Sequence, residues 1–218
     1  MAWRHLDQGR VGELPLDLYE RDGEYQVRVD GQELMSSLCH ASEEALADLA
    51  AAAVPAPAPR VLVAGLGLGY TLAALVRRLG GAAVEVVEKS PDVLRWYRLH
   101  FREKVLRGAD DGAVRFREAD AVDVLRAGTG GWDLVVLDVD NGPEPLAGEG
   151  NRWLYEAAGL AAIRARLRPG GALLVWSGFR SEPFEARARE AGYAVSSVEI
   201  PLTRPGVAHH LYLCALPR

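Results

Sequence analysis

Short, continuously apolar runs alternate with helical patterns along most of the sequence after residue 60. The apolar runs consist largely of Val and Leu, and most of them lead into a turn and an amphipathic stretch. Strands that are apolar throughout are buried on both faces, as in parallel sheets that are covered by helices on both sides. We therefore predict a doubly wound α/β fold with strands that include VLVA (61–64), VEVVE (84–88), VRFRE (114–118), DLVVLD (133–138) and ALLVWS (172–177).

Two further strand patterns close the sequence, AVSSVEI (194–200) and HLYLCAL (210–216). Only a polar loop lies between them, so we predict a terminal antiparallel hairpin. A mostly parallel, Rossmann-like sheet that ends in such a hairpin is the architecture of class I methyltransferases. It differs from the all-parallel sheet of dinucleotide-binding folds.

The first part of the sequence has a different character. Residues 14–35 contain two alternating runs and two turn dipeptides, Asp22-Gly23 and Asp30-Gly31, which favour β-hairpins. A helix pattern follows in SEEALADLAAAA, with Ser42 as the expected N-cap, before the proline-rich VPAPAPR. We predict a β-hairpin and helix arm over residues 1–54 and a main, methyltransferase-like domain over 60–218.

The composition limits the partners of the chain. Of its 218 residues, 49% are hydrophobic and 25% charged, and the net charge of −5 favours a small or cationic substrate over nucleic acid. No apolar run approaches the roughly 20 residues of a membrane span, and MAWRHLDQGR lacks a signal-peptide core. We expect a cytoplasmic protein with Cys39 and Cys214 as free thiols and with neither nucleic acid nor a membrane as partner.

The motif VLVAGLGLGYT (61–71) carries the strongest chemical information. A buried strand leads into Gly65, Gly67 and Gly69 and then into a helix, so the backbone can pass close to a ligand. The dinucleotide fingerprint G-x-G-x-x-G fails, because Tyr70 follows Gly69. The spacing G-x-G-x-G is used by S-adenosylmethionine enzymes, although tight packing alone also explains such a turn.

Acidic residues follow the next two strands. Glu88 ends the second strand, where its carboxylate could accept hydrogen bonds from both hydroxyls of a ribose. Asp120 follows the third strand, where it could accept a hydrogen bond from an adenine amine. An N-cap for the helix that begins near Val122 is an equally good interpretation of Asp120.

Asp138 ends the fourth strand, at the edge of the sheet where doubly wound folds bind ligands. A carboxylate there could orient an attacking amine or accept its proton. The glycine-rich run after Asp138 has the composition of a mobile lid, or it is a plain loop in which Asn151 caps the next helix.

Taken in order, GLGLGYT, EVVEKSPDVL, EADAVDVL, DLVVLDVDNGPE and LRPGGALLVWS resemble the spermidine synthase family over about residues 60–215. The resemblance implies a homodimer with a catalytic aspartate, Asp138, which also contacts the cofactor. It further implies a cofactor site formed by Gly65, Gly67, Gly69, Tyr70, Glu88, Lys89, Asp120 and Ala121, and a substrate site that includes Asp140, Asn141 and Trp176.

Three positions depart from the family pattern. Leu68 and Asn141 stand where aminopropyltransferases carry aspartates, and Trp176 stands in place of a glutamine. Because each change removes a partner for a cationic amine, we favour methyl transfer from S-adenosylmethionine to a small amine- or hydroxyl-bearing acceptor. The alternatives are aminopropyl transfer from decarboxylated S-adenosylmethionine and a non-catalytic nucleoside-binding protein.

The remaining candidates receive structural interpretations. His209 and His210 are adjacent in a predicted strand and point to opposite faces, so we expect structural roles and no metal site. Trp96, Tyr97 and Phe101 have helical spacing and are expected to pack in the core.

Overall fold

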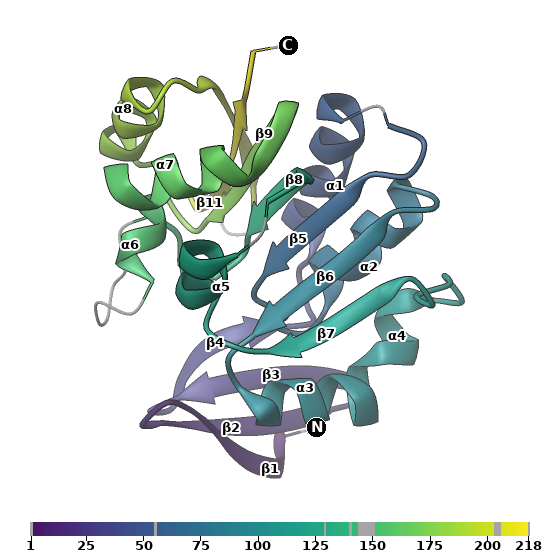
Figure 1. Ribbon diagram of the computed structural model, residues 1–218. Coiled ribbons are helices and arrows are strands. Elements are labelled where there is room, and N and C mark those ends of the chain that lie inside the picture. The colour runs from purple at the N-terminus through teal and green to yellow at the C-terminus, as the bar shows by residue number, and fades with distance from the viewer. Residues whose placement is uncertain are drawn as a thin grey trace.

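The computed structural model describes residues 2–54, 56–128, 130–139, 141–143, 151–202 and 206–217, and its strands form two sheets (Figure 1). The larger sheet has the strand order β10-β11-β9-β8-β5-β6-β7. Strands β5 to β9 run parallel, and β11 is antiparallel to both β9 and β10, which confirms the predicted fold class. The strands are β5 (Arg60–Ala64), β6 (Ala83–Glu88), β7 (Val114–Glu118), β8 (Trp132–Leu137), β9 (Leu167–Ser177), β10 (Ala194–Pro201) and β11 (Ala208–Ala215).

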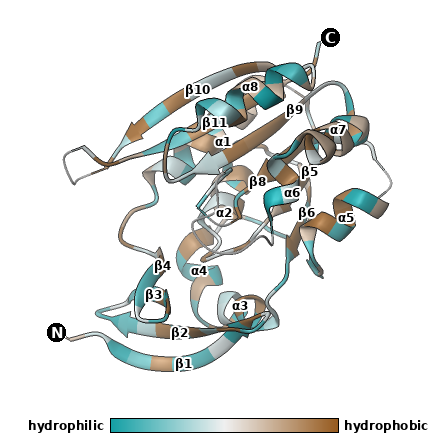
Figure 2. Cartoon of the chain, turned by 90° about the vertical axis from the view of Figure 1, so that its left-hand side faces the viewer, coloured by the Kyte–Doolittle hydropathy of each residue, from teal (hydrophilic) through white to brown (hydrophobic). Residues whose placement is uncertain are grey.

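The central strands are buried on both faces because helices cover both sides of the sheet. Val61 and Val63 point into one hydrophobic cluster, while Leu62 and Ala64 point into the other, as the alternation along a strand requires. The first cluster is closed by α1 (Ala41–Ala53) and α2 (Tyr70–Arg78), and the second by α5 (Ala121–Ala127), α7 (Ala157–Arg166) and α8 (Glu182–Glu190). Figure 2 shows the hydrophobic residues of β9 at the centre, whereas the outlying β1 is largely hydrophilic.

The segment after β6 is a helix of three parts, α3 (Pro91–Trp96), a π-helical turn (Tyr97–Phe101) and α4 (Arg102–Leu106). Ser90 caps it by accepting a hydrogen bond from the Val93 N–H at 3.2 Å. Trp96, Tyr97 and Phe101 are almost fully buried, so their predicted role in the core is confirmed.

The amino-terminal sheet is larger than predicted. It has four antiparallel strands, β1 (Arg4–Val11), β2 (Leu14–Arg21), β3 (Glu24–Val29) and β4 (Gln32–Ser36). The two hairpin turns lie where the sequence placed them, and Asp22 and Gly23 both have positive φ, at 53° and 81°. The strand β1 was not predicted, because its mostly polar sequence lacks the alternation of a half-buried strand.

Contacts with α3 hold this sheet beside the main one. Asp7 of β1 pairs with Arg95 and accepts a hydrogen bond from Trp96 Nε1 at 2.9 Å. The Ser90 hydroxyl donates to the carbonyl oxygen of Arg10 at 2.6 Å. These contacts place β4 opposite the carboxyl ends of the central strands (Figure 1).

One local prediction was wrong. The arm helix begins at Ala41 with His40 at the N-cap, and Ser42 is instead a buried residue within its first turn. Before β9 the chain forms α6 (Arg152–Tyr155) and α7, which the extended residue Glu156 separates. Leu167 follows α7, pairs with Trp132 and begins β9.

The helix α1 packs against α2, β9 and β11. The proposed division of the chain at residues 54 and 60 stays a prediction. Within the described ranges, no helix combines the length and the apolar character that crossing a membrane requires.

Candidate functional site

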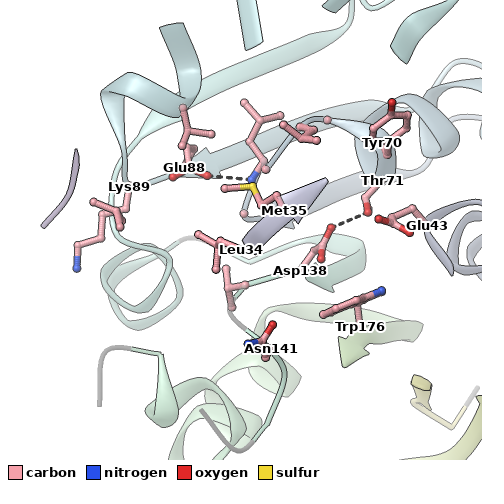
Figure 3. Close-up of a pocket in the computed structure, with 18 of the residues that line it drawn as sticks. Leu34, Met35, Glu43, Tyr70, Thr71, Glu88, Lys89, Asp138, Asn141 and Trp176 are labelled. Carbon is pink, nitrogen blue, oxygen red and sulfur yellow. Dashed lines mark hydrogen bonds between the residues drawn. The ribbon is translucent and has the colours of Figure 1, made fainter. Parts of the chain in front are cut away.

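A cavity of about 450 Å³ lies between the carboxyl ends of the central strands and β4 (Figure 3). Leu34 and Met35 of β4 form the wall that faces the Gly loop. Asp140 lies outside the described residues. Every other predicted site residue lines the cavity: Gly65, Gly67, Gly69, Tyr70, Glu88, Lys89, Asp120, Ala121, Asp138, Asn141 and Trp176.

The Gly loop combines packing with access to the cavity. All three glycines have positive φ, from 54° at Gly67 to 90° at Gly69. A Cβ on Gly65 would overlap the carbonyl oxygen of Asp138, and one on Gly69 would overlap the ring of Tyr97. Two of the three glycines are therefore required by the fold itself, whereas a Cβ on Gly67 would meet only the Sδ of Met35, at 3.3 Å.

Glu88 ties the Gly loop to the end of β6. Its Oε2 accepts a hydrogen bond from the Leu66 N–H at 3.0 Å, and its Oε1 accepts one from the Ser90 N–H at 2.8 Å. Burial raises the pKa of Glu88, and the backbone donors offset part of this effect. The side chain of Glu88 also borders the cavity, where a ribose is predicted.

Asp120 is the N-cap of α5. Its Oδ1 accepts a hydrogen bond from the Val122 N–H at 2.8 Å, and its Oδ2 is 2.8 Å from Lys89 Nζ. The capping interpretation is thus confirmed, while the adenine interpretation stays a prediction. Lys89, expected at the cofactor, points away from the cavity in Figure 3 and neutralises Asp120.

Asp138 lies beside the Gly loop, just after β8. Its backbone N–H donates to the Ala64 carbonyl oxygen at 2.9 Å, and its Oδ2 accepts a hydrogen bond from Thr71 Oγ1 at 2.6 Å. Burial raises the pKa of this carboxyl, and the Thr71 hydroxyl offsets part of the effect. Thr71 was not predicted as a site residue, since only the packing of α2 against the end of β8 brings it to Asp138.

Glu43 and His209, at the other end of the cavity, were not predicted as site residues. The ring of His209 contacts Trp176 edge to face with centroids 4.6 Å apart, and burial lowers the pKa of this imidazole. Burial and the charge of Asp138 raise the pKa of Glu43 to about 7. We expected only a structural role for His209, but it lies on the face of β11 that borders the cavity.

The ionisable side chains that line the cavity are mostly acidic. Among the described residues they comprise five carboxylates and only two basic groups. Of the two basic groups, Lys89 contacts Asp120, and His209 is neutral near pH 7 because its pKa is lowered. The end of the cavity around Asp138 therefore offers carboxyl groups, and no described residue that lines it supplies a cation to them. The carboxylates belong to Glu33, Glu43, Glu88, Asp120 and Asp138.

The strand order with its antiparallel β11, together with a cavity at the Gly loop, defines a Rossmann-like protein of the class I methyltransferase fold. Neither the known protein-family models nor the curated proteins include a match to this sequence. Solved structures do match, and they include two spermidine synthases and a probable spermidine synthase.

One is a spermidine synthase in complex with the transition state analogue AdoDATO, with a TM-score of 0.76 and 17% identity over 97% of this chain and 72% of that one. The spermidine synthase from Thermotoga maritima has a TM-score of 0.77 at the same identity and coverage. A probable spermidine synthase from Corynebacterium glutamicum has a TM-score of 0.68 and 13% identity, over 99% of this chain and 80% of that one. The similarity confirms a spermidine synthase-like fold.

Proposed function

We propose that this protein is a transferase that binds decarboxylated S-adenosylmethionine and transfers its aminopropyl group to a small amine. The acidic end of the cavity carries the proposal, because no described residue there supplies a cation. Decarboxylated S-adenosylmethionine bears only positive charges, on its sulfonium and its ammonium. S-adenosylmethionine adds a carboxylate, and two like charges about 4 Å apart repel by roughly 4 kcal/mol at an effective dielectric constant of 20.

The other end of the cavity suits the nucleoside. Glu88 borders the cavity, where its carboxylate would accept hydrogen bonds from the ribose hydroxyls, and Asp120 and Ala121 border the space that an adenine would occupy. The glycines keep the loop backbone close to the ligand. The complex of a structurally similar spermidine synthase with AdoDATO supports the same choice of ligand.

Asp138 is the proposed catalytic residue. The sulfonium makes the adjacent carbon of the aminopropyl chain electrophilic. The amine nitrogen of the acceptor forms a bond to that carbon as the carbon–sulfur bond breaks, which leaves neutral methylthioadenosine. Asp138 accepts the proton that the amine loses, and its raised pKa makes it a stronger base than an exposed aspartate. Thr71 holds the carboxylate in one orientation.

This proposal reverses the order of preference that the sequence suggested. The sequence favoured methyl transfer because it lacks two aspartates and a glutamine of the family pattern, which are replaced by Leu68, Asn141 and Trp176. The cavity nevertheless gains a second carboxyl group near Asp138, because Glu43 reaches it from α1.

Calorimetry with four ligands separates the candidate functions. We expect decarboxylated S-adenosylmethionine and methylthioadenosine to bind, S-adenosylmethionine to bind more weakly, and NAD not to bind. Tighter binding of S-adenosylmethionine than of its decarboxylated form would support methyl transfer and contradict the proposal. Incubation with putrescine, followed by chromatography for methylthioadenosine, tests turnover, and binding without product would indicate a nucleoside-binding protein.

We further propose a cytoplasmic homodimer that acts on a small amine. The resemblance to spermidine synthases supports the dimer, and the two free cysteines, exposed Cys39 and buried Cys214, suit a reducing compartment. Light scattering coupled to gel filtration tests the dimer, and cell fractionation tests the location.

A further inference from the structure

Glu43 lies in the first turn of α1, far in sequence from the Gly loop, yet it borders the same cavity as Asp138. In Figure 3 the carboxylates of Glu43 and Asp138 lie on either side of the Thr71 side chain. The packing of α1 against α2 produces this arrangement, since Thr71 belongs to the first turn of α2.

A buried hydroxyl fixes the orientation of Glu43. Ser42 is fully buried, and its Oγ is 2.6 Å from Glu43 Oε2, 3.0 Å from Trp176 Nε1 and 2.8 Å from His209 Nδ1. An indole N–H only donates, and a hydroxyl donates one hydrogen bond and accepts two. Ser42 therefore donates to Glu43 when the His209 Nδ1 carries a proton, and all three contacts are satisfied at once.

The charges around Glu43 lack a positive partner. Asp138 approaches it from the end of β8 and Glu44 from α1, and both raise its pKa. Glu44 is itself paired with Arg77, while His209, on β11, is neutral near pH 7. Among the described residues that line this end of the cavity, none supplies a cation to Glu43 or Asp138.

We propose that Glu43 and Asp138 together bind the primary ammonium group of decarboxylated S-adenosylmethionine, and that Ser42 holds Glu43 in place. The proposal rests on the proposed function and extends it to a residue of the arm. It also explains how the chain retains amine recognition with Leu68 in the Gly loop, since the carboxylate comes from α1 instead.

The test compares two ligands in the full chain. Glu43→Gln preserves the size of the side chain and a hydrogen bond with Ser42 but removes the charge. We expect this variant to bind methylthioadenosine, which has no ammonium, as the wild type does. We expect it to bind decarboxylated S-adenosylmethionine roughly 10- to 100-fold more weakly, as for the loss of one hydrogen bond to a charged group.

Proton release gives a second measurement. Because Glu43 has a pKa of about 7, about half of it is protonated at pH 7 in the empty cavity. A bound ammonium favours the ionised form, so binding should release up to about half a proton, which calorimetry in buffers of different ionisation enthalpy detects. Glu43→Gln should abolish this release.

Glu44→Gln is the matched control, because Glu44 is adjacent in sequence but pairs with Arg77. It should leave the affinity for both ligands unchanged and reduce the proton release only slightly, because Glu44 contributes least to the raised pKa of Glu43. Equal affinity of Glu43→Gln and wild type for the decarboxylated ligand would overturn this inference alone. Failure of the wild type to bind that ligand would overturn the proposed function and the inference with it.

Discussion

Glu88 is predicted to have two separable roles, in the stability of the Gly loop and in nucleoside binding. Replacement of Glu88 by Ala leaves the N–H groups of Leu66 and Ser90 without their acceptors. Both residues are buried, with 3% and 0% of their surface exposed. Because they join a charged group, the two hydrogen bonds together contribute roughly 3 kcal/mol to the stability of the fold. Burial of the Glu88 carboxylate, which raises its pKa, costs free energy, so its removal offsets part of this loss.

We therefore expect Glu88→Ala to lower the free energy of unfolding by about 2 kcal/mol. For a chain of this length the melting temperature should fall by roughly 4–8 °C, as measured by circular dichroism. The affinity for methylthioadenosine should fall by at least roughly tenfold, because the ribose hydroxyls lose a charged acceptor.

Glu85→Ala provides the control on the same strand. Glu85 pairs with the exposed Arg117 at 3.5 Å, and such surface pairs contribute roughly 0–1 kcal/mol. If Glu88→Ala and Glu85→Ala have the same melting temperature, the two hydrogen bonds to Glu88 do not stabilise the fold as argued. If Glu88→Ala has the lower melting temperature but binds methylthioadenosine as the wild type does, Glu88 stabilises the Gly loop but does not bind the ribose.

Three other variants probe the remaining parts of the site. Asp138→Asn should bind methylthioadenosine normally while turnover falls by roughly 10²- to 10⁴-fold in a product assay, and full activity would reject a role in proton transfer. Gly65→Ala should destabilise the fold by at least about 2 kcal/mol in urea unfolding, because φ is +88° and its Cβ would overlap the Asp138 carbonyl, and a stable variant would contradict this close approach. Glu43→Gln should alter the pH dependence of stability. The folded-state pKa of about 7 exceeds the ordinary value of 4.5, so the wild type loses roughly 1–3 kcal/mol as the pH rises from about 4.5 to 7. The variant should lack this loss, and parallel stability curves for the two proteins would contradict the raised pKa.

The main fold was predictable because its signals are local. The central strands are rich in Val and Leu, as Val61–Ala64 illustrates, and turns such as those at Asp22-Gly23 and Gly65 carry residues that favour positive φ. Strand β1 was not predicted, because it is mostly polar and is held by contacts between residues far apart in sequence, such as Asp7 with Trp96.

The nucleoside end was predictable for a related reason. Parallel strands end at one edge of the sheet, so Gly65, Glu88 and Asp120 gather there once the strand order is known. Their partners were less accessible to prediction. The sequence left the two interpretations of Asp120 open, and only the 2.8 Å contact with the Val122 N–H established the cap.

The end of the cavity around Glu43 and Asp138 could not be predicted from local sequence, because three segments that are far apart in sequence build it. Glu43 comes from the arm helix, Asp138 from β8 and His209 from β11, and Ser42 joins the first to the last across 167 positions. A helical pattern assigns Ser42 to a cap and Glu43 to solvent, since it does not show what covers the first turn. Comparison with the family pattern registered the groups lost at Leu68, Asn141 and Trp176 but not the carboxylate of Glu43. The family pattern does not include a carboxylate that reaches the cavity from another element. The ionisable residues of the whole cavity therefore predict the ligand better than the Gly-loop motif alone.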